Sequence, residues 1–115
     1  MREVNLFNLT PHTVNVMDQE GNVVFSVDPS GTVARCKATT VETEKVLFCG
    51  HELSLTKTQM GEVQDLPEGE NPDTIFIVSR VVADAAKRGD LRVPDQAVRN
   101  DKGQVIGCMS LSTVL

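Results

Sequence analysis

The sequence predicts a mainly β fold of the α+β class: an antiparallel sheet or small barrel with one short helix packed across it. Short apolar segments rich in valine, isoleucine and leucine recur between turn clusters, which is typical of strands. Aromatic residues are scarce, with four Phe and no Tyr or Trp, so the core must consist of branched aliphatic side chains, which favour strands. Residues 80–88 alone have the periodicity of a helix.

The first third of the chain has the pattern of a β-meander. Its predicted strands are residues 4–9, 14–16, 23–27 and 33–41. Thr10, Pro11 and His12 separate the first two strands, and the later strands follow turn clusters at residues 18–22 and 28–31. Tight turns between successive strands favour an antiparallel arrangement.

The middle of the chain predicts a short hairpin followed by a loop. Residues 42–45 are mostly charged and are expected to interrupt the preceding strand. Residues 46–48 and 53–55 are mostly apolar and flank Cys49-Gly50, which predicts a hairpin with glycine at its turn. Residues 64–73 combine prolines, a glycine and several acids, and are expected to form a solvated loop.

The strongest local pattern is a strand followed by a helix. Residues 74–78 form a continuous apolar run of strand length, which indicates a strand buried on both faces. Ser79 is the expected N-cap of a helix over residues 80–88, and Gly89 supplies its stop. Val81, Val82, Ala85 and Ala86 lie on one side of this helix, and Val82, Ala85 and Ala86 are expected to pack on the sheet.

The last part of the chain predicts further strands. Residues 91–93 form a short extended segment that is expected to end before Pro94. Residues 98–99 and 105–106 bracket the hairpin turn at residues 100–103. The apolar tail, residues 108–115, is expected to form a last strand or a contact between subunits.

Length and charge limit the classes of function. The 115 residues fit one domain, residues 1–115, with enough chain for one core. The formal charge of −5 has no dominant basic face, and there are no aromatic platforms on which bases stack, so we expect no binding to DNA or RNA. The charge distribution is still compatible with a local basic pocket for one small anion.

Cysteine spacing and hydropathy point to a reducing compartment. Cys36, Cys49 and Cys108 are odd in number and form no CxxC pair, so free thiols are expected rather than disulfides or a zinc site. The N-terminal residues lack the apolar core of a signal peptide, and no apolar run is long enough to cross a bilayer. The sequence predicts a cytoplasmic protein with no membrane partner.

Two short segments carry the candidate site residues. Ser79 and Arg80 lie where the helix is expected to begin, and their hydroxyl and guanidinium groups suit a phosphate or carboxylate; the alternative is a plain N-cap beside a surface arginine. His12 and Thr10 lie in a turn, where the histidine either binds a ligand or bonds its own backbone. No catalytic or metal-binding spacing is present, so we expect neither an enzyme nor a cofactor.

Several short motifs occur in a fixed order along the chain: residues 8–12, 29–31 with 34–35, 61–63 with 66–67, 77–79, 98–100 with Gly103, and 107–108. Taken together, they resemble a family of small uncharacterised proteins of phages, prophages and actinobacterial genomes. The resemblance spans nearly the whole chain. This chain departs from the pattern at Asn100-Asp101, where Arg-Asp is more usual, and at Cys49, where Asp is more usual.

The resemblance implies a phage-encoded protein of an infected bacterial cell that counters host defence. By analogy with small oligomeric sponges, we expect it to sequester a phosphate-bearing nucleotide signal, of the cyclic ADP-ribose or cyclic dinucleotide type, without cleaving it. The expected ligand-binding residues are Thr10, His12, Arg35, Ser79, Arg80 and Arg99. The alternatives are a protein–protein inhibitor or phage accessory factor, and a small hydrolase. A homodimer or higher homo-oligomer is expected because the tail is apolar and aromatics are few.

Overall fold

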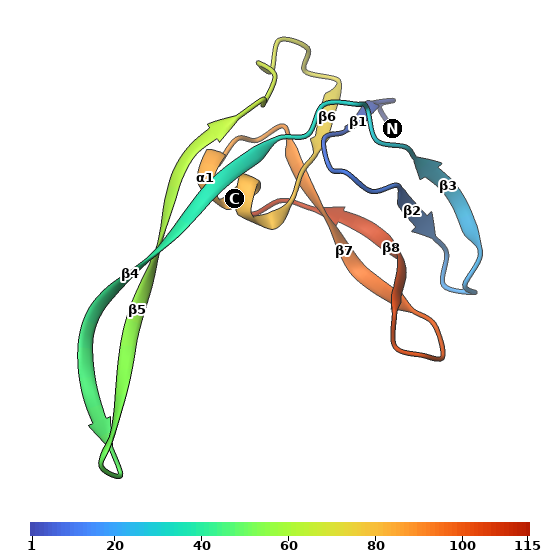
Figure 1. Ribbon diagram of the computed structural model, residues 1–115. Helices are drawn as coiled ribbons and strands as arrows, with labels where there is room; N and C mark the ends of the chain where they lie inside the picture. The colour runs from blue at the N-terminus through green and yellow to red at the C-terminus, as the bar shows by residue number, and fades with distance from the viewer.

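Nine secondary-structure elements form a mixed sheet, a helix and a projecting hairpin (Figure 1). The structure is a computed structural model that describes residues 1–115. The elements are β1 (Asn5–Asn8), β2 (Val14–Met17), β3 (Val23–Val27), β4 (Arg35–Phe48), β5 (His51–Gln64), β6 (Thr74–Ile77), α1 (Arg80–Ala86), β7 (Leu91–Arg99) and β8 (Val105–Ser112). The predicted fold class, mainly β with one short helix, is confirmed.

The main sheet has the strand order β1-β6-β7-β8-β2-β3 and is mixed rather than wholly antiparallel. Strand β6 runs parallel to β1 on one side and to β7 on the other, because α1 carries the chain back between β6 and β7. Strand β8 is antiparallel to β7 and meets β2 at one parallel bridge, between Val16 and Cys108. The later strands β6, β7 and β8 therefore lie together in the middle of this sheet, between β1 on one side and β2 and β3 on the other.

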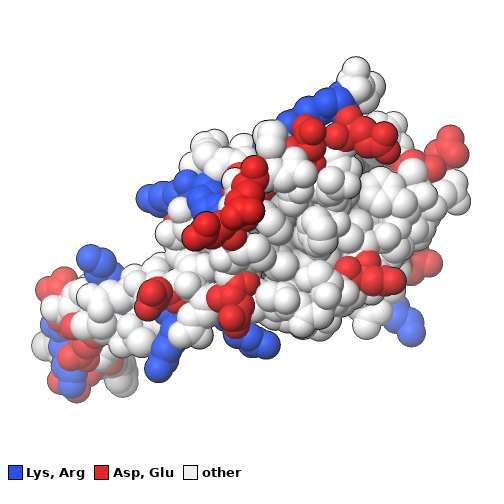
Figure 2. Space-filling model, turned by 90° about the horizontal axis from the view of Figure 1, so that it is seen from above, with Lys and Arg blue, Asp and Glu red and all other residues white.

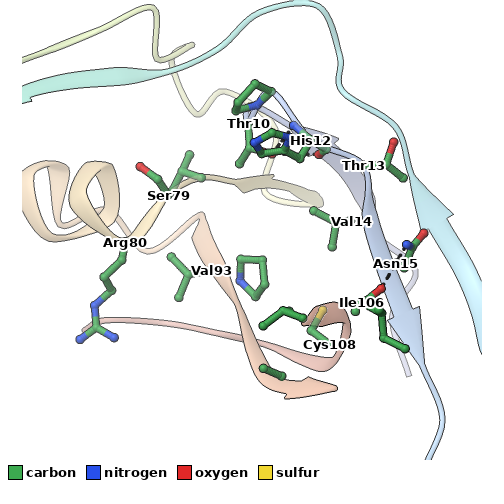
Figure 3. Close-up of a pocket in the computed structure, with 16 residues that line it drawn as sticks. Thr10, His12, Thr13, Val14, Asn15, Ser79, Arg80, Val93, Ile106 and Cys108 are labelled. Carbon is green, nitrogen blue, oxygen red and sulfur yellow. Dashed lines mark hydrogen bonds between the residues drawn. The ribbon is translucent and has the colours of Figure 1, made fainter. Parts of the chain in front are cut away.

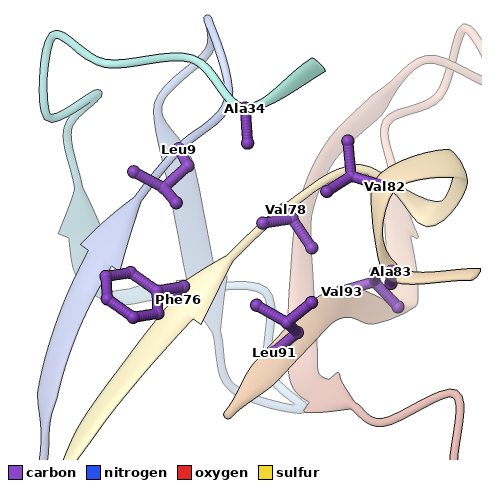
Figure 4. Close-up of a cluster of buried hydrophobic side chains, with 8 residues drawn as sticks. All are labelled: Leu9, Ala34, Phe76, Val78, Val82, Ala83, Leu91 and Val93. Carbon is purple, nitrogen blue, oxygen red and sulfur yellow. The ribbon is translucent and has the colours of Figure 1, made fainter. Parts of the chain in front are cut away.

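The core lies on both faces of β6, as expected for residues 74–78. Figure 4 shows the larger cluster, which consists of Leu9, Ala34, Phe76, Val78, Val82, Ala83, Leu91 and Val93. Ile77 faces a second, smaller cluster with Val14 and Cys108. Phe76, Ile77 and Val78 are all buried, because side chains alternate between the two faces of an extended chain and both faces are covered here.

Helix α1 begins where the sequence predicts, and part of its predicted packing face is confirmed. The Ser79 hydroxyl accepts a hydrogen bond from the Val82 backbone N–H at 3.4 Å, so Ser79 is the N-cap. Val82 is buried and Ala86 packs against the larger core cluster, as predicted. Ala83, which was not predicted to pack, is buried as well, Ala85 is only partly buried, and Val81 is 40% exposed. The helix ends at Ala86, because Lys87 takes the left-handed conformation and donates its N–H to the carbonyl of Ala83.

Residues 35–64 form a two-stranded hairpin, here called the arm, that projects from the body (Figure 1). The turn at Cys49 and Gly50 is confirmed, and both residues have positive φ. The predicted break at residues 42–45 is wrong, because β4 continues through it with an irregularity between Glu42 and Glu44. Most side chains on both faces of the arm are exposed, so charged residues carry little desolvation cost there.

Strand β7 continues through Pro94, where the sequence predicts an end. Pairing with β6 involves only Leu91 and Arg92, so the next part of β7 is an open edge on that side. Pro94 is paired with Leu111 of β8 on the other side. Because β6 does not extend alongside Pro94, no carbonyl of β6 needs the N–H that proline lacks. The predicted turn at residues 100–103 is confirmed by the Asn100 side chain, which accepts from the Lys102 and Gln104 backbone N–H groups.

No helix has the length and apolar composition that crossing a membrane requires.

Candidate functional site

A cavity of about 820 Å³, here called the first cavity, opens between the start of β2, the end of β6 and the β7–β8 hairpin (Figure 3). Its floor is mostly apolar and is formed by Val14, Val78, Val93, Pro94, Ala97, Val105, Ile106 and Cys108. Its polar border is formed by Thr10, His12, Thr13, Asn15, Ser79 and Arg80. An apolar floor with a few convergent polar groups is the usual composition of a small-molecule site.

The turn that carries His12 is held by one buried asparagine. Asn8 is 1% exposed, and its Nδ2 donates to the carbonyl oxygens of His12 at 2.7 Å and Val27 at 2.9 Å. Its Oδ1 accepts from the Thr10 backbone N–H at 3.0 Å and lies 2.7 Å from the Thr10 hydroxyl. Both ends of this amide are therefore satisfied, and residues 10–13 are fixed at the border of the cavity.

Ser79 and Arg80 border the cavity directly after β6, at the sheet edge where the parallel strand β1 also ends. The Arg80 side chain is largely exposed, and its Nε lies 3.3 Å from the Asp84 carboxylate, in an i,i+4 ion pair. In Figure 3 its guanidinium points away from His12 and Ser79. Both predicted anion ligands at this junction are therefore engaged with their own helix, because the Ser79 hydroxyl accepts from the Val82 N–H and Arg80 pairs with Asp84.

A second cavity, of about 520 Å³, adjoins the first at the base of the arm. Thr10, Pro11 and Ser79 line both cavities and so form the wall between them. Arg35 and Lys37 line only the second cavity, where both are exposed and neither makes an ion pair within the chain. The free positive charge near the candidate site therefore lies in the second cavity.

The two adjoining cavities bring together five of the six predicted ligand residues: Thr10, His12, Arg35, Ser79 and Arg80. Arg99 lies apart from them, because it is at the far end of β7 and donates to the Gly103 carbonyl within its own hairpin turn, at 2.7 Å. A third cavity, of about 420 Å³, is bordered by Glu68 and Glu70 and is unsuited to anions.

Two residues of the site are not found by sequence reasoning. Lys37 lies two residues from Arg35 on β4, at the irregularity between Cys36 and Ala38, and is identified only because it lines the second cavity. Asn8 is identified only by its burial and bonds, although an asparagine that ends a strand before Thr-Pro is a recognisable turn signal. Both missed roles depend on contacts between segments far apart in the sequence.

The three cysteines are free and differ in their surroundings, which predicts different reactivity. Burial raises the pKa of the Cys108 thiol above its ordinary value of 9.0, whereas Cys49 is exposed in the arm turn. We expect iodoacetamide at pH 8 to modify Cys49 first and Cys108 last, followed by mass spectrometry of digested protein. Equal rates for Cys49 and Cys108 would contradict the structure, and urea-denatured protein is the control in which all three react.

The same shift gives a direction for stability against pH. Because the folded pKa of Cys108 is raised, the folded protein keeps this thiol protonated at pH values where the unfolded chain ionises it. The contribution of Cys108 to stability is therefore complete below the unfolded pKa and is lost as the pH rises through the folded pKa.

The composition of the cavities is the available guide to function. No family model matches the chain, and neither curated proteins nor solved structures provide a match. The function of the two cavities is therefore inferred from their own residues.

Proposed function

We propose that this protein binds and sequesters a phosphate-bearing nucleotide in the two adjoining cavities, without cleaving it. The proposal rests on one observation. An apolar cavity adjoins a basic one, and the hydroxyl-bearing residues Thr10 and Ser79 line both of them. A nucleotide has the matching parts: a flat, weakly polar base, a ribose, and a phosphate that carries the charge.

The apolar floor of the first cavity is the proposed seat of the base, with His12 at its border contacting the base or ribose. Arg35 and Lys37 are the proposed phosphate ligands, because they are the cations of the second cavity and are free of carboxylate partners. Thr10 and Ser79 would contact the ligand where it crosses the wall. Arg80 would join only after leaving Asp84.

Sequestration is favoured over hydrolysis by the lining of the cavities. His12 is the one titratable side chain of the first cavity apart from Arg80 and Cys108, and no aspartate or glutamate borders either cavity. A histidine without a carboxylate to orient it, and without a second acid or base, lacks the usual parts of a hydrolytic site.

The family resemblance supplies the context of this proposal. We propose that the ligand is a nucleotide immune signal of the cyclic ADP-ribose or cyclic dinucleotide type, held in the cytoplasm of an infected bacterial cell by a homodimer or higher homo-oligomer. A second candidate, a protein–protein inhibitor or phage accessory factor, is favoured by the edge strand β3, on which Val23, Val24 and Phe25 are exposed.

We expect Arg35→Ala to weaken nucleotide binding about ten- to a hundred-fold, because a charge-assisted hydrogen bond to phosphate contributes roughly 1.5–3 kcal/mol. Arg99→Ala is the matched control: it removes the same charge from an exposed site outside the cavities and should bind like wild type. Calorimetry with a panel of cyclic dinucleotides, ADP-ribose and cyclic ADP-ribose isomers measures both.

Three outcomes would contradict the proposal. Wild-type protein that binds no member of the panel would exclude a nucleotide of these classes, and equal binding by the Arg35→Ala variant would remove the phosphate site from the second cavity. Mass spectrometry of ligand released by heating is the third test. Intact ligand supports sequestration, whereas altered ligand, with alteration abolished by His12→Ala, would identify an enzyme.

A further inference from the structure

The arm gives the molecule more surface than a monomer of its size requires. The accessible surface is 8210 Å², against about 6200 Å² for a compact monomer of the same mass. The radius of gyration is 17.8 Å, against about 13 Å for a compact domain of this length. The excess of about 2000 Å² exceeds the roughly 800 Å² per partner that a specific interface covers.

One face of the arm gathers its apolar residues. Val46 pairs with Leu53, and Leu53 and Leu55 are two residues apart on one strand, so all three share a face. Phe48 lies two residues beyond Val46 on β4 and therefore lies on the same face. Val41 pairs with Lys57, and Lys57 lies two residues from Leu55 on β5. Val41 therefore lies on this face as well. Their pairing partners Glu44, His51 and Lys57 lie on the same face, beside the apolar side chains. We call Val41, Val46, Phe48, Leu53 and Leu55 the apolar face of the arm.

The apolar face has no partner within the chain. Four of its five residues are exposed, Phe48 by 73%, and the fifth, Val46, is only half-buried. A two-stranded hairpin that is not packed on another layer is marginally stable in water. The arm contacts the body at its base, where Cys36 and Val63 pack against the larger core cluster, but its outer part has no such support.

The charges of the arm fit a second copy of the same arm. Four basic and four acidic side chains are distributed along it: Arg35, Lys37, Lys45 and Lys57, with Glu42, Glu44, Glu52 and Glu62. The arm is therefore neutral, and the whole charge of −5 belongs to the body. None of these eight side chains makes an ion pair within the chain. Figure 2 shows the two signs intermixed on the projecting part of the molecule.

We propose that two copies of this chain dimerise through their arms, with the apolar face of one arm packed on the apolar face of the other about a two-fold axis. In such an interface the same patch of both copies meets, so a patch with a net charge would face an equal charge of the same sign. The arm avoids this repulsion because it is neutral and carries both signs. Contact between two bodies, each carrying −5, would instead bring like charges together. The dimer requires no ligand and is independent of the nucleotide proposal.

The test is the mass in solution by analytical ultracentrifugation. Wild type should sediment at twice the 12.5 kDa of the chain at micromolar concentration, and Leu53→Glu/Leu55→Glu should sediment as a monomer. The matched control is Leu47→Glu, because Leu47 is 74% exposed at the same end of the arm but points to the opposite face. This control should remain dimeric.

A complementary variant separates loss of the interface from loss of folding. Leu53→Lys/Leu55→Lys should also be monomeric alone, and an equimolar mixture with the glutamate variant should recover the dimer, because opposite charges then meet across the axis. A monomeric wild type, a glutamate variant that remains dimeric, or a mixture that stays monomeric would overturn the proposal. Rings or filaments larger than a dimer would also overturn it, because they indicate a head-to-tail contact.

The two proposals fail separately in these measurements. A wild-type protein that is monomeric but still binds nucleotide would reject the arm interface alone. A wild-type dimer that binds no nucleotide would reject the proposed function alone.

Discussion

Replacing Asn8 with alanine is expected to lower the free energy of unfolding by about 3 kcal/mol or more. The asparagine side chain satisfies the carbonyl groups of His12 and Val27 and the backbone N–H of Thr10. Each buried polar group left without a partner costs about 1–3 kcal/mol. A thermal melt should show the midpoint falling by about 10 °C or more for a domain of this size.

The matched control is Asn71→Ala. Asn71 also caps a local turn, accepting a hydrogen bond from the Asp73 backbone N–H at 2.9 Å, but in an exposed loop. Its loss should change stability by at most about 1 kcal/mol, because water replaces the missing partner. Equal melting temperatures for the Asn8 and Asn71 variants would show that Asn8 does not organise the turn that carries His12.

Placing an aspartate at Ala83 is expected to destabilise the protein by roughly 3–5 kcal/mol, since it buries a charge with no partner. Ala83 is 1% exposed and packs in the larger core cluster. The equilibrium measurement is urea unfolding, with the midpoint compared between variant and wild type at constant slope.

Val81→Asp is the control for this helix, because Val81 is on the solvent side of α1 and is 40% exposed. It should lose no more than about 1 kcal/mol, as surface substitutions usually do. The opposite ranking, with Val81→Asp more damaging than Ala83→Asp, would mean that the helix packs with Val81 toward the core and Ala83 toward solvent.

The error in the helix face has a simple physical origin. Apolar residues occur at Val81, Val82, Ala83, Ala85 and Ala86, so nearly every position of this short helix fits an apolar stripe. A seven-residue helix makes about two turns, which is too few for periodicity to select one stripe over its neighbour. The N-cap Ser79 was predictable because capping depends on one local side chain.

Most strand positions of the body were predictable, apart from the continuation of β7 through Pro94, and the length of the arm was not. Residues 23–27 match β3 because a β-branched and aromatic segment between two turns has a local signature. Residues 42–45 lack that signature, since no neighbour demands apolar side chains on either face. Strand formation there depends on the facing strand β5 and its turn at Cys49-Gly50.

Three of the site residues were predictable from local chemistry, and their meeting was not. Thr10, His12 and Ser79 stand at a turn and a helix cap, which sequence patterns identify. They come together because β1 pairs with β6 in parallel, so both strands end at the same edge of the sheet. Arg99 was predicted to join them and does not, because the β7–β8 hairpin carries it away from that edge.

The interleaved strand order implies a fixed sequence of events as the chain leaves the ribosome. Strands β1 and β2 find their inner neighbours only in β6 and β8, so the body cannot close until residues 105–112 have been made. The arm pairs with itself across a two-residue turn, which is the kind of local contact that forms fastest. The pairing partners of the arm are therefore all present in a nascent chain whose body still lacks β6, β7 and β8, so the proposed arm interface requires no strand of the body to be made first.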